Sequence, residues 1–218
     1  MDIELKKVFD RIAPSWYNFR HRSIFKEELE ELAVVWKQGK LLNLGCGHGA
    51  DFLAFRDNFD LYGVDFSSGM LKQAQKYAAK FKYDVSLVDA DICCLPFADN
   101  TFDWAIAVAT YHHVKGREER LKALIELRRV LKPGAEAFIT VWNKGQPAFW
   151  FKTKDVKIPW REKETTLLRH YHLFSYHEAK KLALKAGFKV LSLKPEKRYR
   201  LPIKYFSRNI CLLVKKED

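Results

Sequence analysis

The sequence has few of the features that would place it outside the ordinary globular proteins. It contains 4 cysteines and 2 methionines in 218 residues, and no cysteine pair has the CxxC spacing of zinc and redox sites. No uninterrupted apolar run approaches the roughly 20 residues that cross a bilayer, and the first residues lack an apolar stretch of secretory type. These absences predict reduced, buried thiols, no metal site, no membrane attachment and a cytoplasmic location.

Positive charge is present in excess, and it is unevenly distributed. The net charge is +12. Residues 144–218 hold 19 Lys/Arg and 7 Asp/Glu, whereas residues 1–143 hold 20 of each, so the last third carries the whole surplus. A surplus concentrated in this way favours a polyanionic partner, and a solvated basic face without a ligand is the alternative.

Strands and helices alternate through most of the chain. Short apolar runs predict buried parallel strands, and amphipathic segments between them predict helices. The expected strands cover residues 40–44, 61–64, 84–88, 102–108 and 135–142, and the expected helices cover residues 3–12, 24–37, 68–81, 117–131 and 175–186. Two last strands, 188–193 and 210–215, have no helix between them and predict an antiparallel pair. The pattern predicts an α/β fold: a doubly wound, mostly parallel seven-stranded sheet with an antiparallel terminal strand pair.

A glycine-rich turn, Asn43-Leu44-Gly45-Cys46-Gly47-His48-Gly49, follows the first expected strand and leads toward an expected helix. Glycines let the backbone turn sharply and let a ligand lie against it, and helix N-terminal amides would face a polar group. Asp65 ends the second strand, where a carboxylate can accept both hydrogen bonds of a ribose diol. These features alone fit dinucleotides as well as adenosylmethionine.

Three further features favour S-adenosylmethionine. Gly49 completes a GxGxG pattern, Asp91 and Ile92 follow the third strand where an acid and an amide can hold adenine, and the terminal antiparallel pair is foreign to dinucleotide domains. In these features residues 38–215 resemble the class I S-adenosylmethionine-dependent methyltransferases. The resemblance implies S-adenosylmethionine as cofactor, bound by Asn43, Gly45, Cys46, Gly47, Asp65, Phe66, Met70, Asp91, Ile92 and Ala109. The family usually has an acid where this chain has Asn43, which predicts a weaker or water-mediated contact to the methionine amino group.

We therefore expect a single methyltransferase domain over residues 1–218. Its expected parts are N-terminal helices (1–37), a cofactor-binding core (38–142), an irregular basic substrate segment (143–174) and a terminal helix with antiparallel strands (175–218).

Scattered motifs resemble the tRNA wobble-uridine carboxymethyl methyltransferases, which esterify the carboxylate of 5-carboxymethyluridine. The specific part is Ile158-Pro159-Trp160 together with Arg169-His170-Tyr171-His172-Leu173-Phe174. Further pieces are Ile12-Ala13-Pro14 with Arg20, Ala109-Thr110-Tyr111-His112-His113, Val141-Trp142 with Gln146, and Asn209-x-Cys211. The resemblance implies tRNA as substrate and a small zinc-binding activator subunit as partner.

The candidate catalytic residues follow from this acceptor. A carboxylate is already ionised at neutral pH and needs no general base, so the site must supply placement and a counter-charge, for which an arginine fork is suited. We expect Arg20 and Arg169 in this role, with His112 and His172 as orienting donors. Arg20 could instead hold the cofactor's own carboxylate, and Arg169 could be one surface cation among many.

Two other functions stay open. A small-molecule methyltransferase acting on a quinone or a carboxylic acid would share the fold, and so would a non-catalytic subunit that only binds S-adenosylmethionine. The basic last third favours RNA over a small molecule, and the intact glycines with Asp65 argue against the non-catalytic subunit. The aromatic run Phe149-Trp150-Phe151 could stack on bases or anchor a loop.

Overall fold

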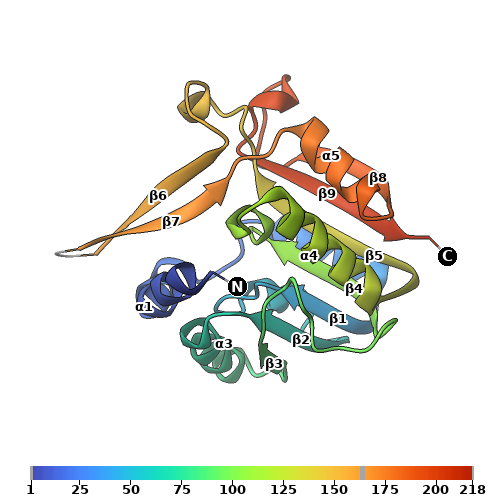
Figure 1. The fold of residues 1–218 in the computed structure, drawn as a ribbon. Coiled ribbons are helices and arrows are strands. Elements are labelled where there is room, and N and C mark those ends of the chain that lie inside the picture. The colour runs from blue at the N-terminus through green and yellow to red at the C-terminus, as the bar shows by residue number, and fades with distance from the viewer. Residues whose placement is uncertain (1, 163–164, 218) are drawn as a thin grey trace.

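A seven-stranded sheet forms the centre of the structure, a computed structural model that describes residues 2–162 and 165–217 (Figure 1). The strands lie in the order β3-β2-β1-β4-β5-β9-β8, and β9 alone runs antiparallel, to β5 on one side and β8 on the other. This confirms the predicted fold class. The strands are β1 (Gly39–Leu44), β2 (Phe59–Asp65), β3 (Ser86–Asp89), β4 (Phe102–Val108), β5 (Leu131–Trp142), β8 (Phe188–Pro195) and β9 (Asn209–Lys216).

The strand order reverses at the centre of the sheet. From β1 the chain moves outward to β2 and β3, and then it returns to place β4 on the other side of β1. The loops that leave β1 and β4 therefore diverge, which opens a crevice at their carboxyl ends.

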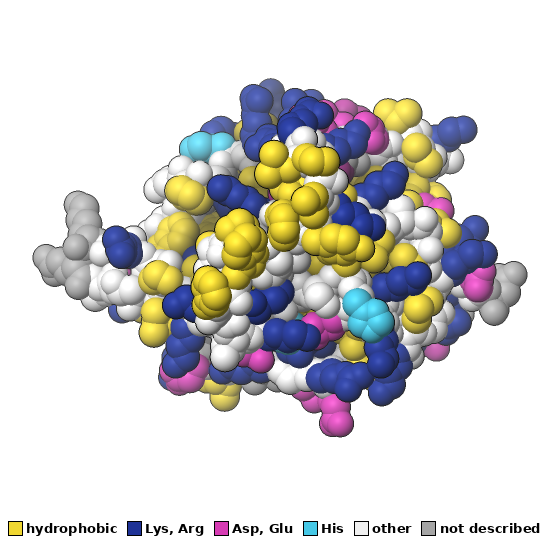
Figure 2. All heavy atoms as spheres, turned by 90° about the horizontal axis from the view of Figure 1, so that it is seen from above, with side chains coloured by type: hydrophobic (Ala, Val, Ile, Leu, Met, Phe, Trp, Pro, Cys, Tyr) yellow, Lys and Arg dark blue, Asp and Glu magenta, His cyan; other side chains and the backbone are white. Residues whose placement is uncertain are grey.

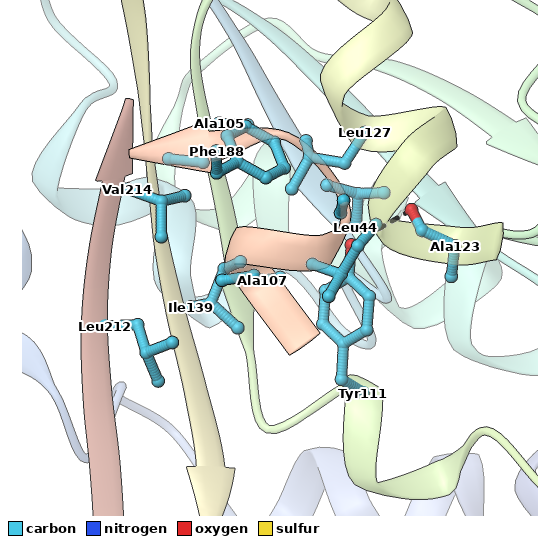
Figure 3. Packing of buried hydrophobic residues seen from close by; sticks show 14 of the residues in the cluster. Leu44, Ala105, Ala107, Tyr111, Ala123, Leu127, Ile139, Phe188, Leu212 and Val214 are labelled. Carbon is cyan, nitrogen blue, oxygen red and sulfur yellow. Dashed lines mark hydrogen bonds between the residues drawn. The ribbon is translucent and has the colours of Figure 1, made fainter. Parts of the chain in front are cut away.

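Helices cover both faces of the sheet. On one face lie α4 (Arg117–Val130) and α5 (Tyr176–Lys185), and on the other lie α2 (Lys26–Trp36) and α3 (Ser68–Phe81), with α1 (Ile3–Phe19) packed against α3. In the first interface Tyr111, fully buried, donates its hydroxyl to the Ala123 carbonyl at 3.2 Å (Figure 3). Within the described ranges no helix has both the length and the apolar character needed to cross a membrane.

The first helix is longer than the prediction, which ended it at residue 12. It continues through Pro14 to Phe19, although proline removes the hydrogen bond to the carbonyl four residues earlier. That carbonyl, of Asp10, lies against Gly69 at the start of α3, where a side chain would collide with it. Burial of the apolar side of α1 against α3 offsets the missing bond.

The connection after β1 also differs from the prediction. The glycine turn leads into a short 3₁₀ helix, η1 (Ala50–Ala54), and not into an α-helix. Few residues remain before β2 begins at Phe59, so a longer helix would leave no chain for the return to the sheet.

The segment predicted to be irregular contains a β-hairpin. Strands β6 (Asp155–Arg161) and β7 (Thr166–His172) pair antiparallel and form a separate sheet that projects from the body above α1 (Figure 1). Alternate residues of β6 are half-buried, starting from Val156, which is the two-residue period of a strand packed on one side. The remaining 3₁₀ turns are η2 (Tyr111–His113), η3 (Pro147–Phe149) and η4 (Lys204–Phe206).

Candidate active site at the carboxyl edge of the sheet

A cavity of about 550 Å³ lies at the carboxyl ends of the parallel strands, within the size range of small-molecule sites. Many of the residues that line it come directly after the strands, so neighbouring strands contribute neighbouring parts of the wall. The predicted cofactor residues that line it are Gly45, Cys46, Gly47, Asp65, Phe66, Met70, Asp91, Ile92 and Ala109.

Asn43, also predicted to bind the cofactor, does not line the cavity. It is fully buried within β1, in register with Gly63 of β2 and Ile106 of β4. Because strand side chains alternate between faces, it shares the face of Leu41, which packs in the core with α2. Neither polar atom of its side chain has a hydrogen-bond partner among the described residues.

The glycine turn holds the carboxylate of Asp65 in place. Gly45 and Gly47 have left-handed φ angles of 63° and 54°, and a side chain at Gly45 would collide with Thr110. The Gly47 amide donates to one oxygen of Asp65 at 2.8 Å, and the Ser67 amide donates to the other at 2.9 Å. Each oxygen keeps a lone pair for a ligand hydroxyl. Burial raises the pKa of Asp65 to about 6, although these amides oppose the shift.

The rest of this wall suits the remainder of the cofactor. Phe66, Met70 and Ile92 give apolar surfaces beside the Asp91 carboxylate, a combination that suits a purine ring and its amino edge. Ala109 adopts a left-handed φ of 57° at the end of β4, and such strain in a non-glycine residue is typical of functional sites. These residues fit S-adenosylmethionine.

Asp51 is a cavity residue that the sequence analysis missed. It lies in η1, lines the cavity and faces the same space as Arg20. Burial raises the pKa of Asp51 to about 6, while its hydrogen bond with Ser23 and the charge of Arg20 act in the opposite direction. It was missed because the segment after the glycines was expected to be an α-helix, which would have set its side-chain directions differently.

The two candidate arginines meet at one tryptophan. The guanidinium carbon of Arg20 lies 5.3 Å from the ring centre of Trp16, and that of Arg169 lies 5.6 Å from the same ring. The Nε atom of each is buried without a hydrogen-bond partner, and neither arginine forms an ion pair with a carboxylate of the described chain. Burial lowers the pKa of Arg20, and the nearby Arg169 contributes to this, whereas the charge of Asp51 acts in the opposite direction.

The two arginines differ in access. Arg20 lines the cavity, as does Trp16. Arg169 is 6% exposed and lies behind the wall, with Trp160 at 5.2 Å and Tyr171 at 5.4 Å from its guanidinium carbon. It is therefore not one surface cation among many, and its charge is stabilised mainly by aromatic faces.

An aromatic wall closes this end of the cavity. Tyr171 stacks on His112 at 4.7 Å and packs against Trp142 at 4.5 Å, and all three line the cavity. Burial holds the pKa of His112 well below its ordinary value. Burial also lowers the pKa of the neighbouring His113 to about 3, and a neutral His113 donates its Nδ1 proton to the His170 carbonyl at 2.9 Å. His48 also lines the cavity, and burial lowers its pKa to about 4, so these three histidines are neutral and weak bases at pH 7.

His172, predicted as an orienting donor, lies outside the cavity lining. Its Nδ1 is 3.0 Å from an Asp155 oxygen and its Nε2 is 2.8 Å from a Glu178 oxygen. Burial alone would raise the pKa of Glu178, but hydrogen bonds from His172 and Lys154 lower it to about 2. His172 therefore ties the base of the hairpin to α5. No group of His, Cys, Asp and Glu within residues 2–162 and 165–217 has an arrangement that could hold a metal ion.

Known proteins resemble this chain in sequence and in fold. Residues 42–139 match the family described as "Methyltransferase domain". A 2-phytyl-1,4-naphtoquinone methyltransferase of Trichormus variabilis is 37% identical over 161 residues, which are 66% of this chain and 67% of that protein. A tRNA (carboxymethyluridine(34)-5-O)-methyltransferase of Arabidopsis thaliana is 31% identical over 145 residues, 64% of this chain and 33% of that protein. The chain thus spans about a third of this relative's length.

A solved structure shares the fold. A Burkholderia thailandensis 1,6-didemethyltoxoflavin-N1-methyltransferase, with bound 1,6-didemethyltoxoflavin and S-adenosylhomocysteine, superposes with a TM-score of 0.73 at 16% identity. The superposition covers 99% of this chain and 88% of that chain. The cavity, the family match and these relatives together show that the chain belongs to the class I methyltransferases, which use S-adenosylmethionine as cofactor.

Proposed function

We propose that this methyltransferase esterifies the carboxylate of a 5-carboxymethyl-type wobble uridine in tRNA. The observation that carries the proposal is the pair of arginines over Trp16, neither of which has a carboxylate partner among the described residues. The charge of Asp51 acts on Arg20 without forming an ion pair, and Arg169 has aromatic rings around it, so an anionic acceptor would supply the paired counter-charge that both cations lack. The name of the Arabidopsis relative supports the same acceptor.

The protonation states of the cavity suit an acceptor that has no proton to lose. His112 and His113 are poor bases because burial lowers the pKa of each. A carboxylate is ionised at neutral pH and can attack without a base. Bound S-adenosylmethionine supplies the methyl group on a positively charged sulfur. Arg20 would contact the acceptor and orient it, while Arg169 adds positive potential from behind the aromatic wall.

The partners follow from the acceptor. A tRNA substrate accounts for the basic last third of the chain and would place the enzyme in the cytoplasm. A small zinc-binding activator subunit, implied by the family resemblance, is part of the same proposal and would be tested by adding such a subunit to the assay below.

The direct test is methyl transfer to tRNA that carries 5-carboxymethyluridine. After incubation with methyl-labelled S-adenosylmethionine, mass spectrometry of the nucleosides should show a methyl ester on this uridine, and mild alkali should release the label as methanol. The proposal would be contradicted if the label on the tRNA resisted alkali. It would also be contradicted if the tRNA stayed unlabelled while a small molecule became labelled. Cofactor binding without transfer to any acceptor would indicate the non-catalytic subunit.

A variant assay tests the arginines. Arg169→Lys should lower kcat/KM for the modified tRNA about tenfold, because a compact ammonium group cannot stack on the surrounding rings as the planar guanidinium does, and the position of its charge behind the wall would change. Cofactor affinity should stay unchanged. Arg56→Lys, at an exposed position outside the cavity lining, is the matched control. A loss of cofactor affinity with unchanged turnover would remove Arg169 from the acceptor site.

A quinone is the second candidate acceptor, favoured by the 37% identity to the naphthoquinone enzyme. The hydroxyl acceptor would be the reduced, quinol form, because a quinone itself carries no hydroxyl. A quinol must lose a proton on methylation, so the rate should increase with pH, whereas carboxylate methylation should stay flat from about pH 6 to 9. A rate that rises through pH 7 and is abolished by His112→Ala would favour the hydroxyl acceptor.

A further inference from the structure

Exposed aromatic side chains gather where two distant loops meet. The first loop carries η3 and continues through Trp150, 51% exposed, and Phe151, 99% exposed. The second carries η4, with exposed Tyr205 and Phe206. We call these four residues the apical patch. Figure 2, which looks down on this end of the molecule, shows hydrophobic side chains near the centre with Lys and Arg side chains around them.

The backbone beneath the apical patch is well fixed by hydrogen bonds. The Asn143 side-chain amide donates to the carbonyls of Tyr205 and Ser207, both at 2.8 Å. The Trp150 indole donates to the Gly145 carbonyl at 2.7 Å, and its ring lies 5.6 Å from that of Phe206. The rings are therefore presented to solvent on a prearranged support, and not because the loops lack contacts.

The rim of the apical patch is cationic. Lys152 follows Phe151 directly and Arg208 lies two residues after Phe206; both are exposed, and neither forms an ion pair with a carboxylate in the part of the chain that the structure describes. The ammonium group of Lys204 lies 5.4 Å from the Tyr205 ring centre. Exposed rings among unpaired cations complement a chain of bases joined by phosphates.

Aromatic contacts connect the apical patch with the cavity. Trp142 lines the cavity and lies 6.0 Å from Phe149, the residue directly before Trp150. The loop that carries Trp150 and Phe151 is therefore in contact with the aromatic wall of the cavity.

We propose that the apical patch binds unpaired nucleotides of the RNA substrate, with bases stacked on Trp150 and Phe151 and phosphates on the surrounding cations. This proposal rests on the proposed function. Stacking accepts any base and uses the flat face of the ring, so it would hold the RNA next to the acceptor nucleotide while the cavity selects that nucleotide. Because the Phe151 side chain is almost fully exposed, packing within the protein does not explain why an aromatic residue stands at this position.

The test measures binding of a labelled anticodon stem-loop and of a labelled oligouridine by fluorescence anisotropy at several salt concentrations. Phe151→Ala and Trp150→Ala should each weaken binding about fivefold or more. Phe151→Tyr should bind like the parent, whereas Phe151→Leu, which keeps apolar area without an aromatic face, should not. Lys152→Ala should lower the slope of log affinity against log salt by about 0.7–0.9, and Phe151→Ala should leave the slope unchanged.

Val35→Ala, at an exposed position on α2, is the control and should change nothing. Two results would overturn the proposal while the proposed function stands. In the first, the enzyme methylates tRNA but the Phe151 and Trp150 variants bind RNA as tightly as the parent. In the second, the Phe151→Leu variant binds RNA as tightly as the parent. The second result, or patch-dependent binding to anionic phospholipid vesicles without RNA binding, would indicate a hydrophobic docking site. If the parent neither binds nor methylates tRNA, the proposed function itself fails.

Discussion

Asp51 and Arg20 place opposite charges on the wall of one cavity, close enough for each to influence the pKa of the other. The amino-acid end of S-adenosylmethionine carries an ammonium group that needs a carboxylate partner. Since Asn43 is buried within β1, we expect Asp51 to accept the ammonium group in its place.

Asp51→Asn should weaken S-adenosylhomocysteine binding about tenfold, because a hydrogen bond to a charged group contributes about 1.5–3 kcal/mol. Binding of 5′-methylthioadenosine, which lacks the amino-acid group, should be unchanged. Asp65→Asn should weaken both ligands if Asp65 binds the ribose. Isothermal titration calorimetry with the two ligands separates these effects, and an equal loss for both in Asp51→Asn would place Asp51 elsewhere.

Cofactor affinity should also depend on pH. Burial raises the pKa of Asp65 to about 6, and only the ionised carboxylate accepts both ribose hydroxyl bonds. The affinity is therefore nearly complete at pH 7 and falls as the pH drops through 6, by about tenfold between pH 7 and pH 5 for one such group. Burial raises the pKa of Asp51 to about 6 as well, so the profile is recorded with 5′-methylthioadenosine, which lacks the amino-acid group, and Asp65→Asn should flatten it. An affinity that rises toward pH 5 in the parent would contradict the assignment.

Much of the cavity could be predicted from the sequence because its residues follow buried strands, and strand ends meet at one edge. Asp65, Asp91 and Ala109 belong to this group. Trp16 and Tyr171 could not be placed in this way, since they come from a helix and a hairpin whose positions depend on packing. His172 lies outside the cavity lining, which its motif could not show because a motif does not reveal which side of its strand faces the cavity.

At the scale of elements, the start of α3 is capped jointly by two segments. Ser67 accepts the Met70 amide at 3.1 Å and donates its hydroxyl to Asp10 of α1 at 2.7 Å. The same Asp10 oxygen accepts the Gly69 amide at 2.9 Å. A carboxylate here satisfies free amides and complements the helix dipole.

Asp10→Ala should therefore lower the free energy of unfolding by about 1–2 kcal/mol, as the loss of an N-cap does. Asp10→Ala and Ser67→Ala should combine to less than the sum of their separate effects, because they share one network. Urea denaturation followed by circular dichroism provides the measurement, with Asp57→Ala at an exposed site as the control. Strict additivity would show that the two side chains cap α3 independently.

The hairpin shows why an element with a visible period was still missed. Residues Val156, Ile158 and Trp160 alternate with polar ones, but Pro159 argues against a strand in any central position. In a two-stranded sheet both strands are edges, so proline is tolerated. Trp160 packs on Trp16 at 5.3 Å, and this contact with α1 is tertiary information that a local pattern does not contain.

At the scale of the whole molecule, the strand order determines where chemistry can occur. The reversal between β1 and β4 creates the cofactor site, and the hairpin and the apical patch extend the same edge of the protein outward. The first half of the chain thus contributes most of the candidate cofactor site, and the last third carries the positive charge and part of the apical patch on which the proposed RNA binding depends.

The position of β9 has a consequence for biosynthesis. This strand inserts between β5 and β8. During translation, one edge of β5 therefore has no strand to pair with until residues 209–216 have left the ribosome. A nascent chain with an open apolar edge strand is exposed to aggregation. A chain ending at residue 208 should therefore form inclusion bodies and associate with chaperones, as sedimentation of expressed lysates would show. Recovery of that shorter chain as a monodisperse species would mean that β5 is protected in another way until the sheet is complete.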